Sequence, residues 1–154
     1  MSHVPLSVEV QRRVRKWAPP RADIAAWAGT ALGTKFAGRQ LGVRVVGRAE
    51  SRRLNARYRG RDKPTNVLSF PAAALPARSP ERPLGDLVIC PDVLRAEARD
   101  QGKSLRAHWA HLIVHGALHL VGYDHERASD AARMERREIS VLRRLGFANP
   151  YRSA

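Results

Sequence analysis

The sequence contains almost no cysteine and no long apolar stretch. Cys90 is the only cysteine among 154 residues, which excludes an intramolecular disulfide. No segment near the N-terminus resembles a signal peptide, and no apolar run is long enough to cross a membrane. We therefore expect a cytoplasmic protein without a membrane partner. Cys90 ends the apolar run 87–90 and is expected to be a buried small side chain rather than a nucleophile.

Acidic residues are also scarce, at 14 Asp and Glu against 28 Lys and Arg, for a formal net charge of +14. Such an excess favours a polyanionic partner, either nucleic acid or an anionic membrane surface. A coding bias toward arginine would produce part of the same excess. The net charge therefore favours a nucleic-acid partner, but it does not exclude an anionic membrane surface or a coding bias.

The length and the apolar pattern predict a single α/β domain spanning residues 1–154. Alternating apolar residues predict strands near 4–10, 41–46, 66–70 and 85–90. Helical spacing predicts helices near 24–32, 50–58, 92–101, 105–122 and 128–145. Ser104 is the expected N-cap of the helix at 105–122, and Gly122 is expected to close it. This order indicates a small mixed sheet of about four strands, with one antiparallel edge, covered by about five to six helices. The proline-containing stretch 72–83 is interpreted as an exposed loop.

Three closely spaced histidines, His115, His119 and His125, predict a metal site. The first two are four residues apart, so on a helix they project from one face, one turn apart. The third follows Gly122 and can close on the same point. Three neutral imidazoles suit zinc, and three protein ligands leave a coordination position for water. We therefore predict one catalytic Zn²⁺ per chain, the alternative being a helix whose histidines bind no metal.

The residues around these histidines indicate which reactions a metal bound there could catalyse. Metalloproteases of the His-Glu-x-x-His type place a glutamate directly after the first histidine, and here Gly116 stands in that position. Peptide hydrolysis is therefore disfavoured. Asp124 and His111 are expected to support the metal ligands through hydrogen bonds rather than to bind the metal. His108 lies on nearly the same helical face and is expected to be packed or similarly supporting.

A basic segment lies between the predicted helix at 50–58 and the predicted strand at 66–70. It carries Arg59, Arg61 and Lys63 around a glycine and a proline. Guanidinium groups bind phosphate bidentately and stabilise charge that builds on phosphorus, so this composition suits a phosphodiester substrate. Charged turns between a helix and a strand are also common without such a role.

The motifs together resemble a known family. The pattern His-Gly-x-x-His-x-x-Gly-Tyr-Asp-His at 115–125, preceded by His-Trp-Ala-His at 108–111, resembles the signature of the YbeY endoribonucleases, which are bacterial ribosomal RNA maturation factors. The segment 58–71, Tyr-Arg-Gly-x-Asp-Lys-Pro-Thr-Asn-Val-Leu-Ser-Phe-Pro, and the segment 84–89, Leu-Gly-Asp-Leu-Val-Ile, resemble two further blocks of that family. The resemblance covers nearly the whole chain, and the segment 72–83 is where it departs.

The resemblance implies an α/β protein in which zinc is held by His115, His119 and His125. It also implies that Arg59 is needed for RNA cleavage within a basic cleft, where we expect Arg61 and Lys63 to bind substrate as well. The implied substrate is single-stranded RNA, with roles in 3′-end maturation of small-subunit rRNA and in ribosome quality control. The implied partners are the small ribosomal subunit through an S11-type protein, and an Era-type GTPase.

The sequence thus predicts a metal-dependent endoribonuclease, with two rival functions. One is a metallohydrolase acting on a peptide or small ester, which Gly116 and the net charge of +14 disfavour. The other is a ribosome-assembly RNA-binding factor with a zinc site and little catalysis, although three ligands without cysteine are not typical of a structural zinc site. The nucleophile is left open between a metal-activated water and the RNA 2′-hydroxyl.

Overall fold

A four-stranded mixed sheet forms the base of the structure, a computed structural model that describes residues 5–72, 83–123 and 127–152. The strands are β1 (Ser7–Arg12), β2 (Gln40–Val45), β3 (Val67–Pro71) and β4 (Pro83–Ile89). Their order across the sheet is β1-β2-β4-β3, in which β1-β2 and β2-β4 are parallel and β3-β4 is antiparallel. The predicted sheet with one antiparallel edge is therefore confirmed.

Within these described ranges, five α-helices and one short 3-10 helix surround the sheet. They are α1 (Arg21–Leu32), η1 (Thr34–Phe36), α2 (Arg48–Arg59), α3 (Pro91–Gln101), α4 (Leu105–Leu120) and α5 (Ala128–Arg144). The predicted helices are confirmed to within a few residues, and η1 adds a turn that the apolar spacing did not signal. Most of the predicted loop 72–83 lies outside the described residues.

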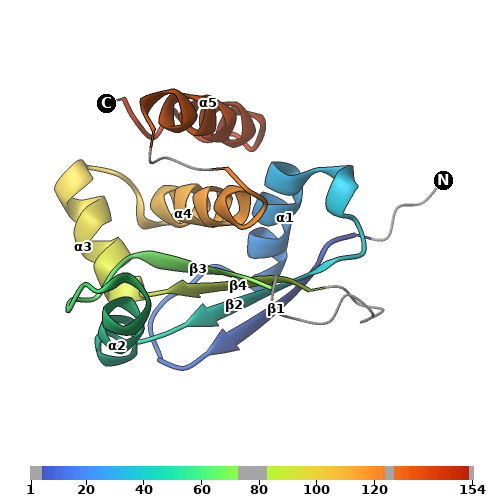
Figure 1. Cartoon of the computed structure of the whole chain (residues 1–154). Coiled ribbons are helices and arrows are strands. Elements are labelled where there is room, and N and C mark those ends of the chain that lie inside the picture. The colour runs from blue at the N-terminus through green and yellow to red at the C-terminus, as the bar shows by residue number, and fades with distance from the viewer. Residues whose placement is uncertain (1–4, 73–82, 124–126, 153–154) are drawn as a thin grey trace.

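The sheet separates two apolar layers, because successive side chains of a strand point to opposite faces. Leu41, Val43 and Val45 of β2 are buried in the main core, against α1 and α4. A smaller cluster of Val46, Leu68 and Val88 packs with Leu54 of α2 and with Phe70. In Figure 1, α1 and α4 lie on one face of the sheet, with α5 stacked beyond α4, and α2 lies by the opposite face.

Among the described helices, α4 has the largest share of buried residues. Ser104 caps its start, since the Ser104 hydroxyl accepts a hydrogen bond from the Ala107 amide at 3.1 Å. From residue 108 to residue 120 every position is buried except His111, His115 and His119, which are half-buried. The helix ends at Leu120, slightly before the predicted end at 122. Burial therefore leaves one histidine stripe of α4 available for chemistry.

Two further expectations concern burial and membrane association. Cys90 is fully buried, as predicted, and burial raises the pKa of its thiol. None of the helices within the described residues is long and apolar enough to cross a membrane.

The close pairing of β3 with β4 depends on Gly85. Its φ angle of 141° lies in the region that favours glycine, and a Cβ at this position would lie 2.3 Å from the backbone oxygen of Phe70. Because backbone atoms of a paired strand cannot yield easily, any side chain at position 85 must disturb this edge of the sheet.

We expect Gly85→Ala to lower the free energy of unfolding by about 2–4 kcal/mol. The matched control is Gly29→Ala within α1, where nothing lies within 4 Å of an added Cβ. That change should leave stability unchanged or raise it by up to about 1 kcal/mol. Urea unfolding of both variants measures the difference, and equal stabilities would contradict the assigned role of Gly85.

Candidate metal centre and basic loop

The half-buried stripe of α4 presents two histidine rings whose Nδ1 atoms are already hydrogen-bonded. His115 Nδ1 lies 3.2 Å from Glu138 Oε2, and His119 Nδ1 lies 3.0 Å from the backbone oxygen of Tyr123. An oxygen acceptor places the proton on Nδ1, so Nε2 is the nitrogen that can bind a metal in both rings. Histidines that bind a metal usually have such an acceptor behind them. The described part of the predicted donor set therefore fits zinc.

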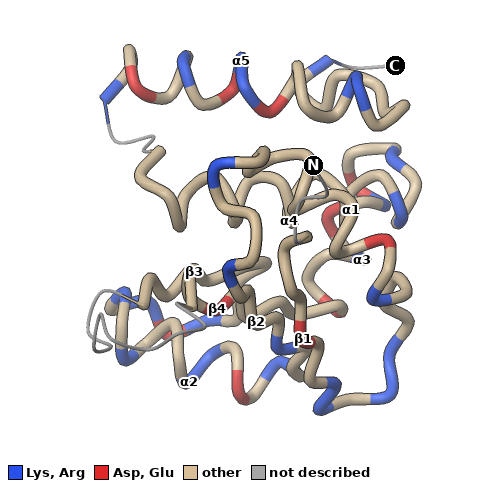
Figure 2. The backbone as a smooth tube through the Cα atoms, turned by 90° about the vertical axis from the view of Figure 1, so that its right-hand side faces the viewer, with Lys and Arg blue, Asp and Glu red and all other residues tan. Residues whose placement is uncertain are grey.

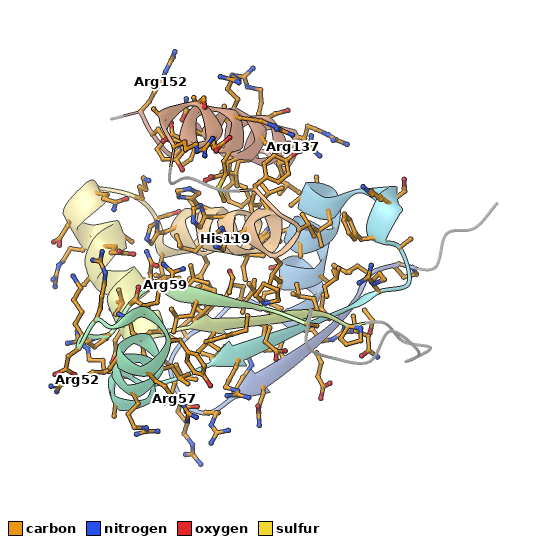
Figure 3. The ribbon with its side chains drawn as sticks, in the orientation of Figure 1. Arg52, Arg57, Arg59, His119, Arg137 and Arg152 are labelled. Atoms are coloured by element: carbon orange, nitrogen blue, oxygen red, sulfur yellow. The ribbon has the colours of Figure 1, made fainter. Side chains whose placement is uncertain are left out.

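The other two residues predicted for this site, Asp124 and His125, lie outside the described residues. His125 as third ligand and Asp124 as supporting residue stay predictions. Figure 3 shows His119 on α4, in the middle of the molecule between the sheet and α5.

A second group of possible ligands shares His115 with the predicted set. Donor atoms of His111, His115 and Glu138 all lie within 4.8 Å of one another. In this arrangement His111 Nε2 is 2.6 Å from Glu138 Oε1. Two ligand atoms around a tetrahedral zinc, with bonds of about 2.0–2.1 Å, lie about 3.3 Å apart. The 2.6 Å between His111 Nε2 and Glu138 Oε1 is the length of a hydrogen bond. Glu138 therefore accepts a hydrogen bond from His111 instead of binding the same ion.

Glu138 of α5 is the buried charge behind the histidine stripe. Its side chain is 1% exposed, and it accepts hydrogen bonds from the rings of His111 and His115 and from the Tyr151 hydroxyl. Burial raises the pKa of this carboxyl, but the hydrogen bonds from the two histidines outweigh it and bring the pKa to about 2. Glu138 is therefore ionised at neutral pH.

Neither Glu138 nor Tyr151 was singled out by the sequence patterns. The signal available was the position of Glu138 on the apolar face of α5, with Met134, Val141 and Leu142. A carboxylate on a buried helix face requires a hydrogen-bonding partner. Its position therefore indicates a buried polar cluster, but it does not indicate the function of that cluster.

The remaining histidines of α4 have different surroundings. His108 is buried, and its Nε2 lies 2.9 Å from Glu97 Oε1, while Glu97 also accepts from the Asn66 amide at 3.2 Å. His111 bonds to Glu138 through Nε2, and its Nδ1 is buried without a hydrogen-bond partner among the described residues. These contacts fit the predicted supporting role of His111, which stays a prediction.

Gly116, at the position of the protease glutamate, faces the sheet. A Cβ there would lie 2.9 Å from Leu87 Cδ2 and 3.4 Å from Val67 Cγ2, and the Gly116 carbonyl accepts a hydrogen bond from Ser69 at 3.3 Å. Glycine at this position therefore lets α4 approach β3 and β4 closely. A catalytic carboxylate at position 116 would be buried in the core rather than directed at the metal.

The predicted basic segment is here called the basic loop and comprises Arg59, the last residue of α2, and the connection 60–66 to β3. It leaves α2 at Gly60, whose φ of 70° closes the helix in the left-handed conformation. Two buried residues of α2 fix it: Asn55 donates to the Lys63 carbonyl at 2.8 Å, and Ser51 exchanges hydrogen bonds with the backbone of Thr65. The loop is thus held at several points, although its cations face outward.

The three predicted cations of the basic loop are exposed. Among the described residues, no ion pair involves Arg59, Arg61 or Lys63, whereas Arg52 pairs with Asp62 through two contacts of 2.7 and 3.0 Å. Figure 2 shows further basic residues along α2 and α5. In Figure 3, Arg59 lies on the side of α2 toward α4, and Arg57 lies on the opposite side.

A cleft of about 610 Å³ is lined by His108, His111 and His115 of α4. Asn66, the last residue of the basic loop, and His115 both line it. Its other walls come from α3, from the start of α4 and from the segment 150–152. A ligand in this cleft would therefore contact His111 and His115, and it would reach the basic loop only at Asn66.

Comparison with known proteins gives concordant matches. The family model described as "Endoribonuclease YbeY" matches residues 9–146. A protein of Alkalilimnicola ehrlichii named endoribonuclease YbeY is 54% identical over 152 residues, covering 96% of this chain and 92% of the relative. The solution structure of a Thermotoga maritima protein is similar in fold, with a TM-score of 0.57 at 21% identity, covering 92% of this chain and 91% of that one.

We expect Gly116→Glu to lower the free energy of unfolding by at least about 3 kcal/mol without creating peptidase activity, because the new carboxylate would be buried against Leu87. The control is Ala107→Glu in the first turn of the same helix, where glutamate completes a capping box with Ser104. The control should stay within about 1 kcal/mol of the wild type. Thermal unfolding and a casein digestion assay test both, and a stable Gly116→Glu protein would contradict the packing argument.

Proposed function

Because the chain belongs to the YbeY endoribonuclease family, we propose that it is a zinc-dependent endoribonuclease acting on single-stranded RNA. Family membership rests on the match over residues 9–146 and on the 54% identical relative, in agreement with the resemblance seen in the motifs. The observation that carries the proposal is that His115 lines a cleft, with Asn66, the residue between the basic loop's cations and β3, on the wall of the same cleft. A metal held at the histidines and the exposed cations of the basic loop would both favour a substrate with a phosphate backbone.

The histidines are proposed to hold the metal through Nε2. His115 and His119 supply two ligands from one face of α4, and His125 is the predicted third. Zinc bound there would act as a Lewis acid toward a phosphate oxygen or a water molecule. The Nδ1 contacts with Glu138 and with the Tyr123 backbone fix the orientation of the two described rings.

The basic loop is proposed to hold the RNA backbone. Arg59 presents a planar fork that matches two phosphate oxygens, and Arg61 and Lys63 add positive charge beside it. The hydrogen bonds from Asn55 and Ser51 to the loop reduce the entropy lost when it engages a phosphate. Arg59 is the residue that we propose for stabilising charge at the scissile phosphate.

The finer roles follow from the family resemblance and are proposed on that basis. They are 3′-end maturation of small-subunit rRNA, ribosome quality control and a cytoplasmic location. An S11-type ribosomal protein and an Era-type GTPase stay predicted partners. The alternative function is a ribosome-assembly factor that binds RNA and zinc with little catalysis, and a cleavage assay separates it from the enzyme.

We expect the purified protein to contain about one zinc per chain and to cleave single-stranded RNA only when metal-loaded. His115→Ala and His119→Ala should each lower the zinc content and abolish cleavage. His108→Gln is the control on the same helix, because His108 bonds to Glu97, and it should keep its zinc. Elemental analysis and a labelled-RNA assay measure both properties. RNA binding with full zinc and no cleavage would favour the assembly factor, and the absence of zinc would refute the metal site.

We expect Arg59→Glu to reduce cleavage by about 100-fold or more, with zinc content and melting temperature nearly unchanged, because Arg59 is exposed. Arg57→Glu makes the same charge change on the other side of α2 and should retain most activity. Arg59→Lys keeps the charge but loses the planar fork, so it should also be impaired. Single-turnover cleavage rates provide the measurement. Equal losses for positions 57 and 59 would mean that only overall charge matters.

A further inference from the structure

We propose that Glu138 is a positioning residue that fixes His115 for metal binding, and that Tyr151 of the C-terminal segment holds Glu138 in place. This inference rests on the proposed zinc site. The side chains involved come from three parts of the chain, α4, α5 and the segment that follows α5, and they meet at one carboxylate.

The contact with His115 determines which ring nitrogen faces the metal. A carboxylate only accepts hydrogen bonds, so the 3.2 Å contact from Glu138 Oε2 places the His115 proton on Nδ1. The lone pair is then on Nε2, and rotation of the ring is restricted. A negative charge behind the ring also makes Nε2 a stronger donor to a cation.

The carboxylate of Glu138 is itself held on its other oxygen. Oε1 accepts from His111 Nε2 at 2.6 Å and from the Tyr151 hydroxyl at 2.7 Å. The side chain is 1% exposed, so water cannot replace these donors without local opening. Oε2 is thereby directed at His115 alone among the described residues, which is the geometry required of a positioning group.

The segment after α5 is docked so that Tyr151 reaches this site. Lys103, in the connection between α3 and α4, donates to the Pro150 carbonyl at 2.6 Å. The Tyr151 amide donates to Asn149 Oδ1 at 2.9 Å, and the Tyr151 ring lies edge-on to the His111 ring with centroids 5.3 Å apart. The C-terminal segment therefore contributes to the metal centre although it lies outside the histidine motif.

The competing role for Glu138 is that of a direct ligand with His111 and His115. The 2.6 Å contact between His111 and Glu138 leaves no space for an ion between them. A direct ligand would make His119 dispensable for binding, whereas a positioning residue leaves His119 essential. Zinc affinity in variants at these positions therefore distinguishes the two roles.

The test is the zinc affinity of the full-length protein, measured by competition with a chromogenic chelator. Glu138→Gln keeps the shape of the side chain but presents an amide that is uncharged, and it should weaken zinc binding by about 10–100-fold. Glu97→Gln is the matched control, because Glu97 accepts from His108 of the same helix in the same cleft but does not touch His115. The control should stay within about twofold of the wild type. Melting temperatures of the metal-free proteins report any general damage.

Tyr151→Phe provides a second variant that removes a single hydroxyl from an exposed residue. It should weaken zinc binding by about threefold, which is less than the full effect of losing a hydrogen bond to a charged acceptor, because Glu138 keeps its bond from His111. If Glu138→Gln does not fold, the comparison of Tyr151→Phe with Glu97→Gln decides the question, and equal affinities would overturn the proposal.

Three other results would also overturn it. They are wild-type affinity in Glu138→Gln, an equal loss in Glu97→Gln, and loss of zinc in Glu138→Gln while His119→Ala retains it. The first two would leave the proposed zinc enzyme intact. Failure of the wild-type protein to bind zinc would instead refute the proposed function, so the two failures are distinguishable.

Discussion

The burial of α4 between the mixed sheet and α5 is the constraint on which the rest of the structure depends. Trp109 and Ile113 are fully buried, and Gly116 allows the helix to approach Leu87 of β4 closely. A helix enclosed on nearly all sides has one stripe left for polar side chains, and in α4 histidines occupy that stripe. Because the packing around it is tight, the rings start from a fixed backbone, which reduces the cost of assembling a metal site.

Packing fixes the backbone of α4, and polar contacts fix the histidine rings. Glu97 of α3 holds His108, and Glu138 of α5 holds His111 and His115. In both carboxyls burial raises the pKa, and hydrogen bonds outweigh it, so each has a lowered pKa and stays charged. The charge of Glu138 is thus buried in a protein that carries a large positive excess, whereas Glu97 is partly exposed. A cation at the histidines would complement that buried charge.

In the basic loop, buried groups likewise fix the backbone while charged groups are exposed. Asn55 and Ser51 are buried and form hydrogen bonds with the loop backbone, while the cations of the loop remain exposed. Arg52 pairs with Asp62, whereas Arg59, the residue proposed to bind a substrate phosphate, has no ion pair among the described residues. A chain with many arginines can therefore have a specific phosphate site, because the local backbone determines which of them are presented together.

Much of this protein could be predicted from its sequence. Apolar alternation and helical spacing are local properties, so they determined the strands and the helices, and the order of these elements favoured a mixed sheet. The four-residue spacing of His115 and His119 likewise fixed that they share a helix face. Which side of α4 meets the sheet, and hence that Gly116 faces Leu87, was decided by packing. The meeting of Glu138 and Tyr151 with His115 was also decided by tertiary structure, because it depends on how α5 and the chain after it dock on α4. Contacts between residues more than 20 positions apart leave no periodic signal in a single sequence.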